Sequence, residues 1–295
     1  MVDLHPVRPA GRRRAGWRLR LSAGWLLLLA LVAVLAPWIA PHDPLAQDLF
    51  AGRLPPAWME GGDALYLLGT DSLGRDVLSR LMHASRVALA VALVAGTLTA
   101  LLGTALGLLA GFLRGWTDRV VSRLVDVWMA FPPVLFSILL VAVAGAGLWT
   151  IVLAVVLIDW TRFARVVRAE AMAQGAMDYV ASARVAGRSR LGTMLHEVLP
   201  NVLPVALAML TLEMGIAVIV EAILSFVNLS IPTDDATWGG MIAEGRASIH
   251  QAWWVLAFPL LALFLTVLAF GQLGEGLRER LDPVLRLRWR CAACR

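Results

Sequence analysis

The chain has 295 residues, of which 59% are hydrophobic, and its mean hydropathy of +0.75 lies well above that of soluble globular domains. Its formal net charge is +5, and all 26 of its basic residues are arginine. This composition predicts a protein that crosses a membrane several times. The absence of lysine excludes a nucleotide-hydrolysing P-loop, whose lysine reaches the terminal phosphates.

Long uncharged runs predict where the chain crosses the membrane. A spanning helix needs about 20 apolar residues, because each residue rises about 1.5 Å through a hydrocarbon layer about 30 Å thick. Uncharged runs of sufficient length occupy residues 22–40, 87–113 and 251–274. The run 127–158 is long enough for two helices with a turn at Gly145-Ala146-Gly147, and a last span extends from about Pro200 to Ser230. We therefore expect an all-α polytopic fold with six transmembrane helices.

The first apolar run also has the outline of an export signal, because the arginines at 12–14 precede the stretch Trp25–Ala36. The run is longer than a usual signal core, and Pro37 directly follows Ala36, the most plausible cleavage residue. We therefore expect an uncleaved transmembrane helix here.

Arginine placement predicts the orientation, since positive residues in short loops are retained on the cytoplasmic side. If the N-terminus is inside, the arginines left outside are Arg53, Arg75, Arg80, Arg86 and Arg246. Both termini are therefore expected in the cytoplasm, and the pI near 10.4 follows from this topology without nucleic-acid binding. The expected organisation is a cytoplasmic tail at 1–21, a first transmembrane helix at 22–40, an extracytoplasmic segment with an amphipathic helix at 41–84, a core of five helices at 85–283, and a cytoplasmic tail at 284–295.

The extracytoplasmic segment contains a candidate amphipathic helix capped by Asp71. Its apolar face would consist of Leu73, Val77, Leu78 and Leu81, and the opposite face would expose Arg75, Asp76 and Arg80. Such a helix is expected at the outer membrane surface, either as part of a pore mouth or as a lid that shields the bundle.

Small residues recur every four positions in the second span, at Gly103, Gly107 and Gly111. This spacing lets two helix backbones approach closely. It predicts a helix contact and not a ligand site.

Two acids, Glu213 and Glu221, lie within the span that begins near Pro200. A charge at mid-bilayer costs roughly 2.5 to 3.5 kcal/mol on insertion scales, so such residues usually have a role. They could couple transport to an ion, or hydrogen-bond to a neighbouring helix or lie near an interface.

A polar segment with three arginines, Tyr179 to Asn201, interrupts the apolar core. Gly187 permits a bend between two amphipathic halves, and Pro200 marks the start of the next helix. The apolar side would consist of Val180, Ala183, Val185, Leu191, Leu195, Val198 and Leu199. The segment is a candidate protein-docking surface; the alternatives are a helix that lies on lipid headgroups and an ordinary loop.

Motifs for intrinsic catalysis are absent from the sequence. The five histidines are scattered, and there is no G-x-S-x-G elbow or H-E-x-x-H pair. Cys291 and Cys294 form a lone C-x-x-C without the further ligands that a zinc site needs, and we interpret it as incidental. We expect no catalytic or metal site, which leaves transport, signalling or a structural role.

Several blocks resemble permeases of binding-protein-dependent ABC importers. Residues 181–200 are similar to their EAA loop, with Ala181-Ser182-Ala183 in the E-A-A place, Gly187 as the glycine and Leu199-Pro200 at the end. Residues 68–80, LGTDSLGRDVLSR, resemble a signature of the dipeptide/oligopeptide permeases. Further similar blocks are Trp160 with Ala164-Arg165 and Arg168, Glu221 with Leu224-Ser225-Phe226, Trp238-Gly239 with Met241, Ala252-Trp253-Trp254, and Gly274-Glu275-Gly276-Leu277-Arg278.

The resemblance covers about residues 20 to 285 and implies the type I ABC importer permease fold, with this chain as the C-type, pore-forming subunit in the cytoplasmic (inner) membrane. It implies four kinds of partner: a second homologous permease, two ATP-binding subunits, an extracytoplasmic solute-binding protein and membrane lipid. ATP and Mg would be bound by the ATPases, and this chain would hold no cofactor. The cargo stays open among dipeptides, longer peptides, nickel chelates and other small solutes, since residues 226–230 depart from the usual family pattern.

The resemblance also assigns site residues. ATPase coupling in an EAA-type loop at 177–200 would involve Tyr179, Ala183, Arg184, Gly187, Arg188, Leu199 and Pro200. The extracytoplasmic gate or binding-protein contact would involve Asp71, Arg75, Asp76 and Arg80. Independently of the resemblance, Glu213 and Glu221 are possible pathway residues because they lie within a predicted span. The competing hypothesis is an ion-coupled secondary carrier, which would transport alone in an imposed proton or sodium gradient.

Overall fold

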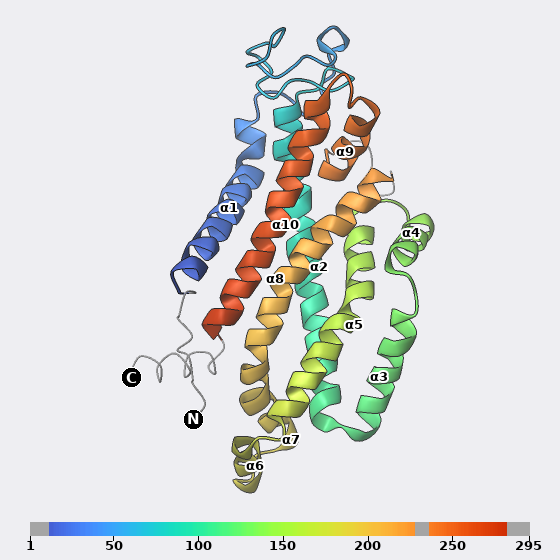
Figure 1. Ribbon diagram of the computed structural model, residues 1–295. Coiled ribbons are helices and arrows are strands. Elements are labelled where there is room, and N and C mark those ends of the chain that lie inside the picture. Colours follow the sequence, from blue (N-terminus) through green and yellow to red (C-terminus); the bar gives the residue numbers. More distant parts are fainter. Residues whose placement is uncertain (1–11, 228–235, 282–295) are drawn as a thin grey trace, which may run out of the picture.

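The computed structural model describes residues 12–227 and 236–281, and this part of the chain is a bundle of helices (Figure 1). The elements are α1 (Arg12–Ile39), η1 (Leu49–Ala51), α2 (Val77–Leu113), α3 (Gly115–Met129), α4 (Pro133–Ala144), α5 (Leu148–Gln174), α6 (Asp178–Val185), α7 (Arg190–Thr193), η2 (Met194–Val198), α8 (Leu199–Phe226), α9 (Trp238–Ala247) and α10 (Trp253–Leu281). The predicted tail at 284–295, with Cys291 and Cys294, and the first eleven residues of the N-terminal tail lie outside the described residues.

Within the described ranges, four helical stretches are long and apolar enough to cross a membrane, or five if a bent pair counts as one span. The four stretches are Trp17–Ile39, Val77–Leu113, Arg190–Phe226 and Trp253–Arg280. The bent pair is α3 and α4, whose axes differ by 84°. The chain is therefore a multi-pass membrane protein, but the two spans predicted in run 127–158 do not meet these criteria as single helices.

One of these two, predicted as the first half of run 127–158, is not a continuous helix. The chain leaves the helical conformation between Met129 and Pro133. Pro132 has no N–H to donate, and a proline disfavours helical backbone in the residue before it, here Phe131. The turn predicted within this run at Gly145-Ala146-Gly147 is confirmed, because α4 ends at Ala144 and Gly145 adopts a φ of +86°.

Helix α2 lies at the centre of the bundle, where it packs on α1, α5 and α8. Its most extensive contact is with α5. The glycine spacing predicted a close helix contact without identifying the partner helix, and that contact is confirmed. A Cβ atom on Gly107 would lie 2.6 Å from the carbonyl oxygen of Ala164, so the two backbones are nearly in contact. Gly103 and Gly111 meet α5 in the same way.

The bundle has two distinct ends (Figure 1). We call the end that carries residues 40–76 and α9 the loop end, and the end that carries α6 and α7 the α6 end. Helix α1 begins and α10 ends on the same side of the bundle as α6, as Figure 1 shows. The two helices touch there, because a Cβ on Gly276 would lie 2.7 Å from Cδ1 of Leu19.

Candidate functional site

At the α6 end, the chain turns sharply between two short helices. Helix α6 ends at Val185, and α7 begins at Arg190 after a turn in which Gly187 has a φ of +84°. Ser189 caps α7, since its Oγ accepts from the backbone N–H of Gly192 at 3.1 Å. The bend predicted at Gly187 is confirmed, and its left-handed backbone is one that glycine adopts without a steric penalty.

The apolar side chains of this segment face in two directions. Val180 and Val198 are fully buried in a cluster with Phe112 of α2 and Val167 of α5, and they anchor the segment to the bundle. Three other large apolar side chains of the segment point outward: Val185 is 89%, Leu191 59% and Leu195 43% exposed. The prediction of one apolar side was therefore wrong, because each half of the segment has both a buried and an exposed apolar residue: Val180 and Val185 before the turn, and Val198 and Leu191 after it.

Three polar side chains that were predicted to couple to a partner have contacts within the chain. The guanidinium of Arg184 lies 5.0 Å from the ring centroid of Phe112, and Arg188 forms an ion pair with Glu197. The hydroxyl of Tyr179 donates to Gln174 Oε1 at 2.7 Å, and burial raises the pKa of Tyr179. The other predicted coupling residues lie close by: Ala183 is half-buried in α6, and Leu199 and Pro200 begin α8.

A shallow hollow of about 480 Å³ lies on the outer face of α6. Its lining residues are Asp178, Ala181, Ser182, Val185 and Ala186. Together with the exposed apolar residues, the hollow gives the α6 end a surface suited to a protein partner.

At the loop end, the structure contradicts the predicted amphipathic helix. Helix α2 begins at Val77, and its N-cap is Asp76, which accepts from the N–H of Ser79 at 3.0 Å. Asp71 instead stabilises the preceding turn, since its Oδ1 accepts from the N–H of Leu73 at 2.8 Å. No separate helix forms at 71–84, because Gly74 makes a tight turn with a φ of +74° before α2 starts.

The predicted exposure of Arg75, Asp76 and Arg80 is also wrong. Arg75 is 8%, Asp76 2% and Arg80 4% exposed. The two guanidinium groups are buried because two carboxylates balance them. Arg75 Nε lies 2.7 Å from Asp71 Oδ2, and Arg80 Nη1 lies 2.5 Å from the same oxygen.

The second carboxylate is Glu244 of α9, which sequence reasoning did not select. Its Oε2 lies 2.8 Å from Arg75 Nη2 and 2.6 Å from Arg80 Nη1. Burial opposes ionisation of Glu244, but the hydrogen bonds and charges of Arg80 and Arg75 outweigh it and hold its pKa below the ordinary value. We call Asp71, Arg75, Arg80 and Glu244 the loop-end ion cluster. It joins the start of α2 to α9.

Both acids predicted within α8 are buried inside the bundle. Glu213 is 3% and Glu221 1% exposed, and the Oγ of Ser225 donates to Glu221 Oε1 at 2.5 Å. A third acid, Asp159 of α5, lies within hydrogen-bonding reach of Glu213 and is 3% exposed. Sequence reasoning missed Asp159 because it ends the apolar run 127–158 and looked like a span boundary.

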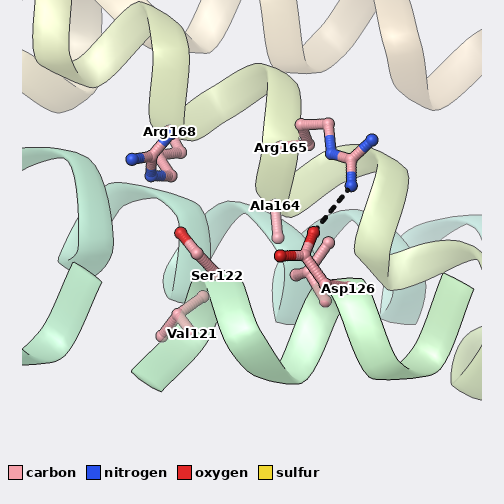
Figure 2. Close-up of a pocket in the computed structure, with 7 residues that line it drawn as sticks. Val121, Ser122, Asp126, Ala164, Arg165 and Arg168 are labelled. Atoms are coloured by element: carbon pink, nitrogen blue, oxygen red, sulfur yellow. Dashed lines mark hydrogen bonds and ion pairs between the residues drawn. The ribbon is translucent and has the colours of Figure 1, made fainter. Parts of the chain in front are cut away.

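A groove of about 340 Å³ separates α3 from α5 (Figure 2). Figure 2 shows Asp126 of α3 facing Arg165 of α5, and these groups lie 3.3 Å apart. Arg168 forms a two-pronged ion pair with Asp118. The charges along the groove are therefore balanced. Over the described parts of the chain, no group of three or more His, Cys, Asp or Glu residues could hold a metal ion.

Comparison with protein families gives two matches. Residues 103–287 match the family described as binding-protein-dependent transport system inner membrane component. Residues 20–56 match the family described as the N-terminal TM domain of oligopeptide transport permease C. The first match alone covers more than half of the chain.

Curated relatives match almost the full length. The chain is 39% identical over 262 residues to the di/tripeptide transport system permease protein DppC of Pseudomonas aeruginosa (strain UCBPP-PA14). The aligned region covers 89% of this chain and 86% of that protein. The chain is 39% identical to the dipeptide transport system permease protein DppC of Escherichia coli (strain K12), with coverage of 89% and 87%. It is 39% identical over 266 residues to the glutathione transport system permease protein GsiD of Shigella dysenteriae serotype 1 (strain Sd197), with coverage of 90% and 86%.

A solved structure has the same fold. It is a chain of the MetNI methionine ABC transporter in an inward-facing conformation, with a TM-score of 0.58 and 18% identity. The match covers 68% of this chain and 96% of that chain. At this identity the similarity establishes the type I ABC importer permease fold.

Proposed function

Because the chain belongs to the family of binding-protein-dependent transport system inner membrane components, we propose that it forms half of the pore of an ABC importer for small peptides. The observation that carries this proposal is the 39% identity to peptide permeases over about nine tenths of the chain. The names of these relatives specify dipeptides, di/tripeptides and glutathione, which are all peptides of two or three residues. We assign the same size class of cargo to this chain.

We propose six crossings with both termini in the cytoplasm. The bent pair α3 and α4 would make one crossing and α5 another. The first part of α5, Leu148 to Ile158, is uncharged, and its charged residues lie in the half nearer the α6 end. Arginine-rich stretches flank the α6 end, which supports a cytoplasmic assignment for that end.

The α6 end is our proposed docking site for the ATPases, which would bind the ATP and Mg. Val185, Leu191 and Leu195 offer exposed apolar contacts beside the hollow on α6. Arg184 and Arg188 have internal partners, so we assign them to shaping this surface. The remaining residues assigned to coupling are Tyr179, Ala183, Gly187, Leu199 and Pro200.

The docked ATPases must supply the energy that opens and closes the pore. To shift a two-state pore from 1:99 to 99:1, a partner must bind one state more tightly by about 5.5 kcal/mol. Rigid attachment of the coupling segment is needed to deliver this energy. Val180 and Val198, both fully buried, provide that attachment.

At the loop end, we propose that the solute-binding protein is received over the loop-end ion cluster. Asp71, Arg75, Asp76 and Arg80 would fix the loops and the start of α2 from within, and would not themselves touch the binding protein, since they are buried.

The docking proposal is tested by affinity purification of the chain from membranes that contain its partner subunits. Val185→Asp should abolish recovery of the ATPases while the second permease is still recovered. Leu49→Asp is the matched control, since Leu49 is 75% exposed at the loop end. Recovery of ATPases with Val185→Asp would refute the docking site. A single-component particle that transports in an ion gradient would instead support the ion-coupled carrier.

A further inference from the structure

Two buried carboxyl groups meet between α5 and α8. Asp159 and Glu213 are each 3% exposed and lie within hydrogen-bonding reach of each other. Both lie near the middle of their helices, which pack directly against one another. At this depth an ionised carboxylate is costly, so the pair must be neutralised locally.

Among the residues that the structure describes, a single positive charge is available to the pair. Arg162 Nη2 lies 3.4 Å from Asp159 Oδ1, and its side chain is 47% exposed. Three of the neighbouring helices add no charge, since α2 from 87 to 113, α4, and α10 from 253 to 274 have no ionisable side chain. In α3, which packs on α5, Asp118 and Asp126 are paired with Arg168 and Arg165, and Arg119 and Arg123 are exposed. In α9, which packs on α8, Glu244 belongs to the loop-end ion cluster and Arg246 lies over the ring of Phe226. Two carboxyl groups therefore face one guanidinium.

Two ionised carboxylates within hydrogen-bonding reach of each other would repel, and one buried negative charge would be left without compensation. A proton on one of them removes both costs, because the protonated group then donates a hydrogen bond to the other. Asp159 is the group paired with Arg162, so its negative charge is the one that is compensated. The proton is therefore best placed on Glu213.

We propose that Glu213 retains a proton and donates it in a hydrogen bond to the Asp159 carboxylate, so that the bridge holds α5 and α8 together as one body. These two helices lead into and out of the coupling segment, since α6 starts at Asp178 and η2 ends at Val198. A displacement of α6 by the ATPases is then transmitted to both helices at once. This role rests on the proposed function, whereas the protonation of Glu213 does not.

The protonation is tested by infrared spectroscopy of the full-length chain in lipid at neutral pH. The wild-type minus Glu213→Gln difference spectrum should contain the absorption of one protonated carboxyl group. Glu275→Gln, on an exposed position of α10, is the control and should leave that absorption in place. A difference spectrum that contains only an ionised carboxylate band would overturn the proposal. This measurement stands even if the chain imports no peptide.

The mechanical role is tested in the assembled transporter by the ratio of peptide imported to ATP hydrolysed. Glu213→Gln should retain the ratio, because its amide also donates to Asp159. Glu213→Leu removes the donor at similar volume and should lower the ratio by about tenfold, the factor that corresponds to a lost hydrogen bond to a charged group. An unchanged ratio in Glu213→Leu, or an equal loss in Glu213→Gln, would refute the bridge.

Discussion

A single methyl group added at Gly107 is expected to push α2 away from α5. The new Cβ would lie 2.6 Å from the carbonyl oxygen and 3.1 Å from the Cα of Ala164, and 2.9 Å from the Cβ of Val167. None of these atoms can move by a side-chain rotation, because they are backbone atoms or the first atom of a side chain. The helix as a whole must shift, although Ala164 and Val167 are almost completely buried.

The magnitude follows from two opposing effects. Overpacking of a tight core typically costs about 1–3 kcal/mol. Alanine has a higher helix propensity than glycine, and this stabilises the folded state by up to about 1 kcal/mol. We therefore expect Gly107→Ala to lower the free energy of unfolding by about 1–2 kcal/mol. Gly103→Ala should cost more, since its Cβ would lie 2.2 Å from Cβ of Phe163.

The assay is thermal unfolding in a mild detergent, with a matched control on another helix. A Cβ atom added at Gly271 of α10 would meet no heavy atom within 4 Å, so Gly271→Ala should keep or slightly raise the midpoint. Gly107→Ala should lower the midpoint by about 2–4 °C for each kcal/mol lost. If the two variants unfold at the same temperature, α2 and α5 are not in backbone contact and the reasoning fails.

Three further predictions concern the loop end. Glu244→Gln leaves two buried arginines facing one carboxylate, so it should destabilise the fold by about 1–3 kcal/mol and raise amide hydrogen exchange in α9. Glu60→Gln, on an exposed loop, is the control. Equal exchange in both variants would contradict the role of the loop-end ion cluster. The pKa of Glu244 is lower in the folded state than in the unfolded state. Ionised Glu244 therefore contributes its full stabilisation of the fold at pH values above its unfolded-state pKa, and this contribution is lost as the pH falls through its folded-state pKa. When the free energy of unfolding is measured against pH, the wild type should lose stability below the ordinary glutamate pKa range, and Glu244→Gln should lack this loss. Superimposable pH profiles of the two proteins would argue against the role of Glu244. Trp254→Phe removes the 3.0 Å hydrogen bond from Nε1 to the Thr70 carbonyl and should cost about 1–2 kcal/mol in chemical unfolding; a neutral result would mean that water replaces the indole.

Local chemistry was enough to predict much of the bundle. The apolar runs gave helices α1, α2, α8 and α10, since a spanning helix must be uniformly apolar whatever its neighbours are. Gly145 and Gly187 were correctly predicted as turns, because glycine tolerates positive φ without help from tertiary contacts. The helix break at Pro132 could also have been predicted from the sequence, because proline disrupts a helix, but the prediction relied on the uncharged run alone.

The charged residues show where sequence reasoning stops. The sequence by itself determined that the chain is a helical membrane permease, because hydropathy, glycine spacing and motif blocks are properties of short stretches. Only the tertiary structure decided which charges are buried. Arg80 pairs with Glu244 across 164 positions, and Asp159 meets Glu213 from another helix. A charge in isolation predicts a surface position, since burial without a partner is costly, and folding alone brings that partner within reach.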